Sequence, residues 1–149
     1  MNKIERSRPV VAIDGPAGAG KSTVTRQVAD QLGYTRVDTG ALYRAVAWLA
    51  LDRGVGLGDS DAIAAVAREL AQPGAIAMGP GLDGTRIVVF GRDVSAAIRD
   101  QAVGLAASQT SQLPEVREAL LAMQRALGRD GGVVLEGRDI GSVVFPDAE

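Results

Sequence analysis

The sequence has 149 residues, a formal net charge of -2 and 46% hydrophobic residues, which is typical of one soluble globular domain. It contains no histidine and no cysteine, which excludes disulfides and any catalytic arrangement built on an imidazole or a thiolate. The small net charge gives no indication of a nucleic-acid or membrane partner, and residues 1–8 lack the apolar core of a secretory signal, so we expect a cytoplasmic protein with neither partner.

The first part of the sequence alternates between strand and helix patterns. An apolar run at 9–14 is typical of a strand buried on both faces of a parallel sheet, and a helix is predicted at 21–32. A second strand is predicted at 34–38 and a second helix at 41–53. The core face of the first helix is predicted to consist of Val24, Val28 and Leu32. Strand, glycine-rich turn and helix in this order are typical of a right-handed βαβ unit.

The hydrophobic period changes in the middle of the chain. Ser60 is predicted to cap a helix that ends before Pro73. Strand-like patterns at 75–78 and 86–90 then flank a turn-rich stretch, which favours an antiparallel pair. We interpret residues 75–99 as a small inserted subdomain.

Two helices and a third strand complete the pattern. The helices are predicted at 100–110 and 114–127, and the strand at 133–136 is expected beside the first strand. The predicted fold is therefore a single α/β domain, 1–149, with a three-layer α/β/α arrangement around a parallel sheet, carrying the antiparallel insert.

A phosphate-binding loop follows the first strand. Residues 15–22 match the pattern G-x-x-x-x-G-K-[ST] between a strand and a helix, as a P-loop requires. Backbone N–H groups and the helix N-terminus would surround the phosphates, Lys21 would reach the β- and γ-phosphates, and Ser22 would coordinate Mg²⁺. The predicted ATP-binding residues are Gly15, Pro16, Ala17, Gly18, Ala19, Gly20, Lys21, Ser22 and Thr23. The alternative is a glycine-rich turn that caps a helix and binds nothing.

A second polar segment lies at the end of the second strand. Residues 38–44 run from Asp38 into the next helix and place Arg44 in its first turns, where it could hold the phosphate of an acceptor. The alternative for this segment taken alone is a capped helix with a solvated arginine.

Together, these and later motifs resemble bacterial cytidylate kinase, a member of the nucleoside monophosphate kinase group of P-loop proteins. The resemblance covers residues 10–149. It rests on Ile13-Asp14-Gly15-Pro16, Asp38-Thr39-Gly40-Ala41-Leu42-Tyr43-Arg44, Arg92-Asp93-Val94-Ser95, Ala106-Ala107-Ser108-Gln109, Pro114-Glu115-Val116-Arg117-Glu118-Ala119-Leu120 and the run from Glu136-Gly137-Arg138-Asp139 to Asp147.

The resemblance implies transfer of the γ-phosphate of ATP to CMP or dCMP with Mg²⁺, giving CDP or dCDP in pyrimidine metabolism. It implies that Arg44 and Arg138 hold the acceptor phosphate, that Ser108, Arg117 and Asp139 recognise cytosine, and that Thr39 and Tyr43 line the sugar side of that pocket. The implied catalytic residues are Lys21, Arg44, Arg138 and Asp139. Insert 75–99 would belong to the acceptor site, and the role of Glu136 stays open.

Physical chemistry supports these assignments. Bidentate arginine forks suit a phosphate dianion, and phosphoryl transfer needs no imidazole. The N4 amino group of cytosine complements a carboxylate such as that of Asp139, whereas uracil would present an acceptor there.

Members of the resembling family continue beyond the position of Glu149 with further strands, an arginine-rich lid and a C-terminal helix. We therefore expect this chain alone to be nearly inactive, and the longer protein to be a monomer. Two other functions stay open: a P-loop kinase for another small acceptor such as UMP, AMP or shikimate, and a nucleotide-binding module without catalysis.

Overall fold

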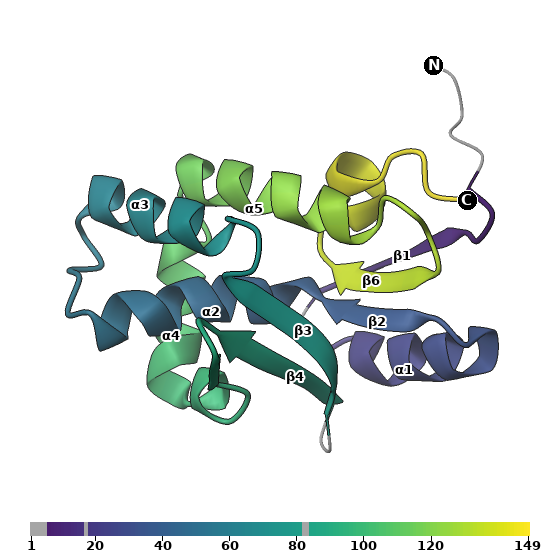
Figure 1. Ribbon diagram of the computed structural model, residues 1–149, viewed down its shortest axis with the longest axis horizontal. Coiled ribbons are helices and arrows are strands. Elements are labelled where there is room, and N and C mark those ends of the chain that lie inside the picture. The colour runs from purple at the N-terminus through teal and green to yellow at the C-terminus, as the bar shows by residue number, and fades with distance from the viewer. Residues whose placement is uncertain (1–5, 17, 82–83) are drawn as a thin grey trace. The chain divides into compact units, whose positions relative to one another are not determined.

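The computed structural model describes residues 6–16, 18–81 and 84–149 (Figure 1). They form two compact units: unit 1 comprises Met1–Thr39 and Gln124–Glu149, and unit 2 comprises Gly40–Met123. In the described part of the chain, no helix has both the length and the apolar character needed to cross a membrane.

Unit 1 is built on a parallel sheet of three strands, β1 (Val10–Asp14), β6 (Val133–Gly137) and β2 (Thr35–Asp38), in the order β1-β6-β2. Helix α1 (Lys21–Leu32) connects β1 to β2, and a short π-helix, η2 (Ile140–Val144), follows β6 (Figure 1). The first four residues of β6 are all buried, as expected for a central strand. The predicted parallel α/β architecture is confirmed, and so is the placement of the third strand beside the first.

Two predictions about burial in unit 1 are wrong. Strand β1 is not buried on both faces: only Val10 is buried, and the next three residues are half-buried, because β1 pairs within the described sheet on one side only. Helix α1 buries Thr25 and Ala29, while Val24 and Leu32 are 48% and 47% exposed. The packed face is thus displaced by one residue from the predicted one, and its small side chains let the helix lie close to the sheet.

Unit 2 has its own apolar core, to which every helix of the unit contributes. Its elements are α2 (Thr39–Asp52, which begins in unit 1), α3 (Ser60–Leu70), β3 (Ile76–Gly81), β4 (Gly84–Val89), β5 (Arg92–Asp93), η1 (Ala97–Arg99), α4 (Gln101–Thr110) and α5 (Pro114–Leu127, which ends in unit 1). Leu42 and Val46 of α2 and Ile63 of α3 are among its fully buried side chains.

Carboxylates begin two helices of unit 2. The side chain of Asp59 accepts a hydrogen bond from the Ala62 amide at 3.1 Å, and that of Asp100 accepts one from the Ala102 amide at 2.9 Å. Ser60 is therefore the first residue of α3 rather than its predicted cap, because the adjacent carboxylate takes that position and also complements the helix dipole.

Strands β3, β4 and β5 form the antiparallel sheet expected within 75–99. Next to β5, the carboxylate of Asp93 accepts hydrogen bonds from the Ser95 hydroxyl at 2.7 Å, the Ser95 amide at 3.0 Å and Arg86 Nε at 3.1 Å. The Ser95 hydroxyl in turn accepts from the Ile87 amide at 2.9 Å. This network holds the segment after β5 against β4.

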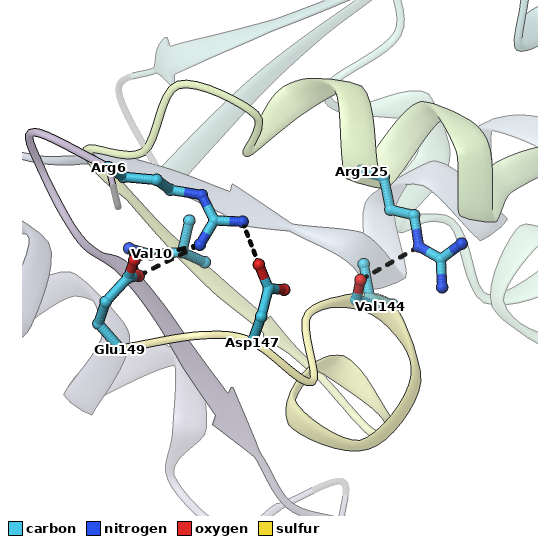
Figure 2. A network of polar contacts seen from close by, with 6 residues as sticks. All are labelled: Arg6, Val10, Arg125, Val144, Asp147 and Glu149. Carbon is cyan, nitrogen blue, oxygen red and sulfur yellow. Dashed lines mark hydrogen bonds and ion pairs between the residues drawn. The ribbon is translucent and has the colours of Figure 1, made fainter. Parts of the chain in front are cut away.

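The two ends of unit 1 are joined by an ion-pair network, in which Arg6 points toward Asp147 and Glu149 (Figure 2). The Arg6 side chain is 4% exposed, and its Nη2 lies 2.8 Å from Asp147 Oδ2. Glu149 Oε2 accepts a hydrogen bond at 2.8 Å from the amide of Val10, which begins β1. These contacts, together with Arg125 donating to the Val144 carbonyl at 3.2 Å, fix the segment after η2.

The hydrogen bonds from Ser95, followed by the contact with Arg86, lower the pKa of Asp93 to about 2. The ionised Asp93 carboxylate therefore stabilises the fold at pH values above its ordinary pKa of 3.8. This contribution is lost as the pH falls through the lowered pKa of about 2. We expect ¹³C NMR of the folded chain to show Asp93 titrating near pH 2. In Ser95→Ala the midpoint should rise toward the ordinary value, and by more than in Arg86→Gln. An unchanged midpoint in Ser95→Ala would contradict this account.

Gly128 packs against the buried ring of Phe145. A Cβ atom at Gly128 would overlap Cζ and Cε2 of the Phe145 ring, so Gly128→Ala forces the ring to move. We expect the free energy of unfolding in urea to fall by about 1–3 kcal/mol. The matched control is Gly104→Ala in α4, where an added Cβ meets nothing within 4 Å; it should be neutral or stabilise by up to about 1 kcal/mol. Equal effects of the two substitutions would refute the steric explanation.

Candidate active site

The described residues of the loop between β1 and α1 contain the tight glycine turn that the sequence pattern predicts. Gly18 and Gly20 adopt left-handed conformations, with φ of 79° and 86°, that residues with a side chain rarely adopt. Gly20 begins α1, and the Nζ of Lys21 turns back over the loop to donate to the Pro16 carbonyl at 3.1 Å. Of the predicted ATP-binding residues, Ala17 lies outside the described residues.

The N-terminus of α1 is open to an anion. Its first turn has no acidic residue, and within the described residues no side chain caps it. Ser22 and Thr23, both exposed, follow directly after Lys21. Amide groups, the helix dipole and the Lys21 ammonium thus add positive potential at one place, where a chain of phosphates would be stabilised.

A buried carboxylate lies behind Ser22. Glu136, 4% exposed at the end of β6, accepts hydrogen bonds through Oε1 from the Ser22 hydroxyl at 3.1 Å and from Arg36 Nη2 at 3.2 Å. Its second oxygen, Oε2, is buried and has no hydrogen-bond partner among the described residues. Glu136 thus contacts both Ser22 and Arg36, while its role in a reaction stays open.

The turn after β6 is attached directly to the start of the P-loop. The Gly15 amide donates to the Gly137 carbonyl at 3.3 Å. Both oxygens of the Asp14 carboxylate accept backbone hydrogen bonds of 2.8 Å, Oδ1 from Ile140 and Oδ2 from Gly141. Asp14 therefore holds the turn that carries Arg138 and Asp139.

Three predicted acceptor-binding residues belong to unit 1. Arg138 is exposed, and its side chain has no hydrogen bond or ion pair with the described residues. Asp139 is half-buried and begins η2. Thr39 is 4% exposed, and its hydroxyl donates to the Glu136 carbonyl at 2.8 Å. Thr39 thus fixes the end of β6, and its contact with a sugar stays a prediction.

The other four predicted acceptor-binding residues belong to unit 2. Tyr43, half-buried, and Arg44, exposed, lie on α2. Ser108 on α4 donates to the Gly104 carbonyl at 3.1 Å, and Arg117 on α5 donates to the Ser111 carbonyl at 3.5 Å. Ser108 and Arg117 thus flank the short connection between the two helices, with their side chains exposed.

The sequence analysis did not identify Asp14 or Arg36 as site residues. Asp14 carries a signal, because it is an acidic residue between an apolar strand and a P-loop. Arg36 carries a weaker one: in strand β2, Arg36 and Asp38 alternate with apolar Val37, which places both charged residues on one face of the sheet.

The sequence matches the family described as Cytidylate kinase over residues 11–149. The chain belongs to the cytidylate kinase family. It is 47% identical over 149 residues to the cytidylate kinase of Citrifermentans bemidjiense, covering 100% of this chain and 62% of that protein. It is also 52% and 53% identical, each over 143 residues, to the bifunctional pantoate ligase/cytidylate kinases of Synechococcus sp. (strain JA-3-3Ab) and Synechocystis sp. (strain ATCC 27184 / PCC 6803 / Kazusa).

Those two alignments cover 95% of this chain and 26% and 27% of the bifunctional proteins. The chain thus spans a part of the length of each of these relatives. The matched range, residues 11–149, contains the P-loop sequence, Glu136, Arg138 and Asp139.

Removing the Asp14 carboxylate should loosen the turn at 138–141. In Asp14→Ala the amides of Ile140 and Gly141 lose their acceptors, and we expect both to exchange with solvent about tenfold faster in NMR hydrogen-exchange measurements. Asp14→Asn retains one acceptor oxygen and should give an intermediate result. Asp30→Ala, on the exposed face of α1, is the control. Unchanged protection in Asp14→Ala would show that other contacts hold the turn.

Proposed function

We propose that this chain forms the P-loop and acceptor-binding part of an enzyme that transfers the γ-phosphate of ATP to CMP or dCMP, giving CDP or dCDP. The observation that carries the proposal is the direct attachment of the P-loop to the turn bearing Arg138, through Gly15 and Asp14. A donor phosphate on the loop and an acceptor phosphate on the arginine would then share one edge of the sheet.

The residues around Ser22 fit a magnesium ion. A serine hydroxyl has one proton and two lone pairs, and the Ser22 proton points to Glu136, so the lone pairs stay available to a cation. Glu136 Oε2, which has no hydrogen-bond partner in the described part of the chain, would add a buried acceptor beside such an ion. When bound with ATP, Mg²⁺ would neutralise part of the negative charge of the phosphates. Ser22 would hold the ion through its hydroxyl oxygen, and Glu136 would orient that hydroxyl by accepting its proton in a hydrogen bond.

Lys21 and the loop amides would bind and orient the donor. In the structure the Lys21 ammonium makes a hydrogen bond to the neutral Pro16 carbonyl, which a phosphate oxygen would replace with a stronger, charge-assisted one. The left-handed glycines allow the chain to turn tightly into α1, where amides of the loop would be available to a phosphate.

Arg138 and Arg44 would hold the acceptor phosphate. Both are exposed, and neither has a side-chain partner among the described residues, so each offers its full set of donors to a dianion. Ser108, Arg117 and Asp139 would recognise the edge of cytosine, and Thr39 and Tyr43 would lie toward the sugar. The aligned phosphates would react in line, with no covalent intermediate on the protein.

The proposal is tested by comparing CMP with cytidine, which lacks the phosphate. In Arg138→Met we expect calorimetry to show CMP binding weakened by about tenfold or more, because a charge-assisted pair is lost, and cytidine binding unchanged. ATP affinity should also stay unchanged, which verifies folding. Arg129→Met, at another exposed arginine of unit 1, is the matched control. If Arg138→Met weakens CMP and cytidine equally, Arg138 does not hold the acceptor phosphate and the proposal fails.

A further inference from the structure

Arg36 forms an ion pair inside unit 1 that the proposed reaction does not require. Its Nη2 lies 3.2 Å from Glu136 Oε1, and the two side chains are 16% and 5% exposed. In the parallel pairing of β2 with β6, Arg36 aligns with Val134 and Asp38 aligns with Glu136. Arg36, Asp38 and Glu136 therefore lie on one face of the sheet, and a guanidinium accompanies two carboxylates there.

This ion pair is poorly built for stability. Arg36 Nε and Glu136 Oε2 are both buried without a hydrogen-bond partner among the described residues. Desolvating two charges while leaving polar atoms unsatisfied costs free energy that one contact of 3.2 Å does not fully return. We therefore look for a role of the Arg36–Glu136 ion pair other than stabilising the fold.

The position of the pair indicates that role. Glu136 Oε1, which Arg36 contacts, is also the acceptor of the Ser22 hydroxyl, the expected magnesium ligand. A buried carboxylate that accepts a hydrogen bond from a hydroxyl would attract a divalent cation by itself, whereas a guanidinium on the same oxygen supplies the positive charge first. Arg36 offsets the charge of Glu136, the carboxylate that contacts Ser22, while Asp38 keeps a negative charge on the same face. The attraction for a bare ion is therefore weaker than that of two carboxylates without a counter-charge.

We propose that Arg36 is a built-in counter-charge that prevents a divalent cation from binding at Ser22 and Glu136 before the nucleotide does. A metal then enters only with a triphosphate, whose negative charges outweigh Arg36. This inference rests on the proposed function, because it assigns the order of loading at the same site. Arg36 acts through Glu136 and touches neither substrate.

The test measures binding of Mn²⁺ alone, without nucleotide, by electron paramagnetic resonance. We expect the unchanged chain to bind Mn²⁺ weakly, and Arg36→Met to bind it at least about tenfold more tightly, because the carboxylate has lost its counter-charge. Arg36→Gln is measured alongside as a second neutral variant, and circular dichroism verifies the fold of each. Arg36→Lys, which keeps the charge, should behave like the unchanged chain.

Two controls separate a local from a general charge effect. Arg26→Met removes the same charge from the exposed side of α1 and should not increase Mn²⁺ binding. The increase in Mn²⁺ affinity should also disappear in the double variant Arg36→Met with Glu136→Gln. In that variant the carboxylate that has lost its counter-charge is absent. No gain in either neutral variant, an equal gain in Arg26→Met, or a gain that survives Glu136→Gln would each overturn the inference.

The same preparations distinguish this failure from failure of the proposed function. If the unchanged chain binds ATP more tightly with Mg²⁺ than with a chelator, while the neutral variants gain no Mn²⁺ affinity, only the role of Arg36 is wrong. If the unchanged chain does not bind ATP at all, the proposed function is wrong and the loading order falls with it.

Discussion

The position of β6 between β1 and β2 is the constraint on which the candidate site depends. All three strands are parallel, so the segments after them, namely the P-loop, the turn at 138–141 and the start of α2, open at one edge of the sheet. The register pairs Ile13 and Asp38 with Glu136. A slip of one residue would turn Glu136 to the other face and bring Leu135 behind Ser22. The register of β6 thus determines which of its side chains lie on each face of the sheet, and with that the position of the buried carboxylate.

Burying the Glu136 carboxylate at this edge costs free energy, which hydrogen bonds from three elements offset in part. Ser22 comes from α1, Arg36 from β2, and Thr39 from the start of α2, where it holds the backbone carbonyl of Glu136. Gly137 permits this arrangement, because a Cβ there would lie 2.6 Å from Thr39 Oγ1. The polar contacts therefore join the strands and helices at the point where a precise geometry is needed.

The P-loop, the parallel sheet and the antiparallel pair could be predicted because each is encoded by adjacent residues. Apolar runs identify strands, and the glycines and Lys21 identify the loop. The packed face of α1 could not be predicted in this way. Val24, Val28 and Leu32 form the more apolar row, but the structure buries the smaller Thr25 and Ala29 and leaves Val24 and Leu32 exposed. The two faces differ by a rotation of one residue, and the apolar pattern alone does not fix that rotation.

The contacts of Glu136 were beyond sequence analysis for a related reason. Ser22 and Arg36 lie 114 and 100 positions away from it, and only the strand register brings them to one oxygen. A charged residue in a four-residue strand such as β2 is equally compatible with a solvated edge, so its pattern could not identify a partner.

The charged groups of unit 1 fall into two kinds, and the difference follows from burial. Arg138 is exposed and its side chain has no partner among the described residues, whereas the Lys21 ammonium donates to the neutral carbonyl of Pro16. Both can exchange water or a weak acceptor for a phosphate oxygen at little cost. Arg36 is half-buried and paired with the carboxylate of Glu136, which is 5% exposed, so leaving it would strip that buried carboxylate of its counter-charge. Cations without an ionic partner are therefore suited to a ligand that arrives and departs, and the paired one to a charge balance that must hold throughout.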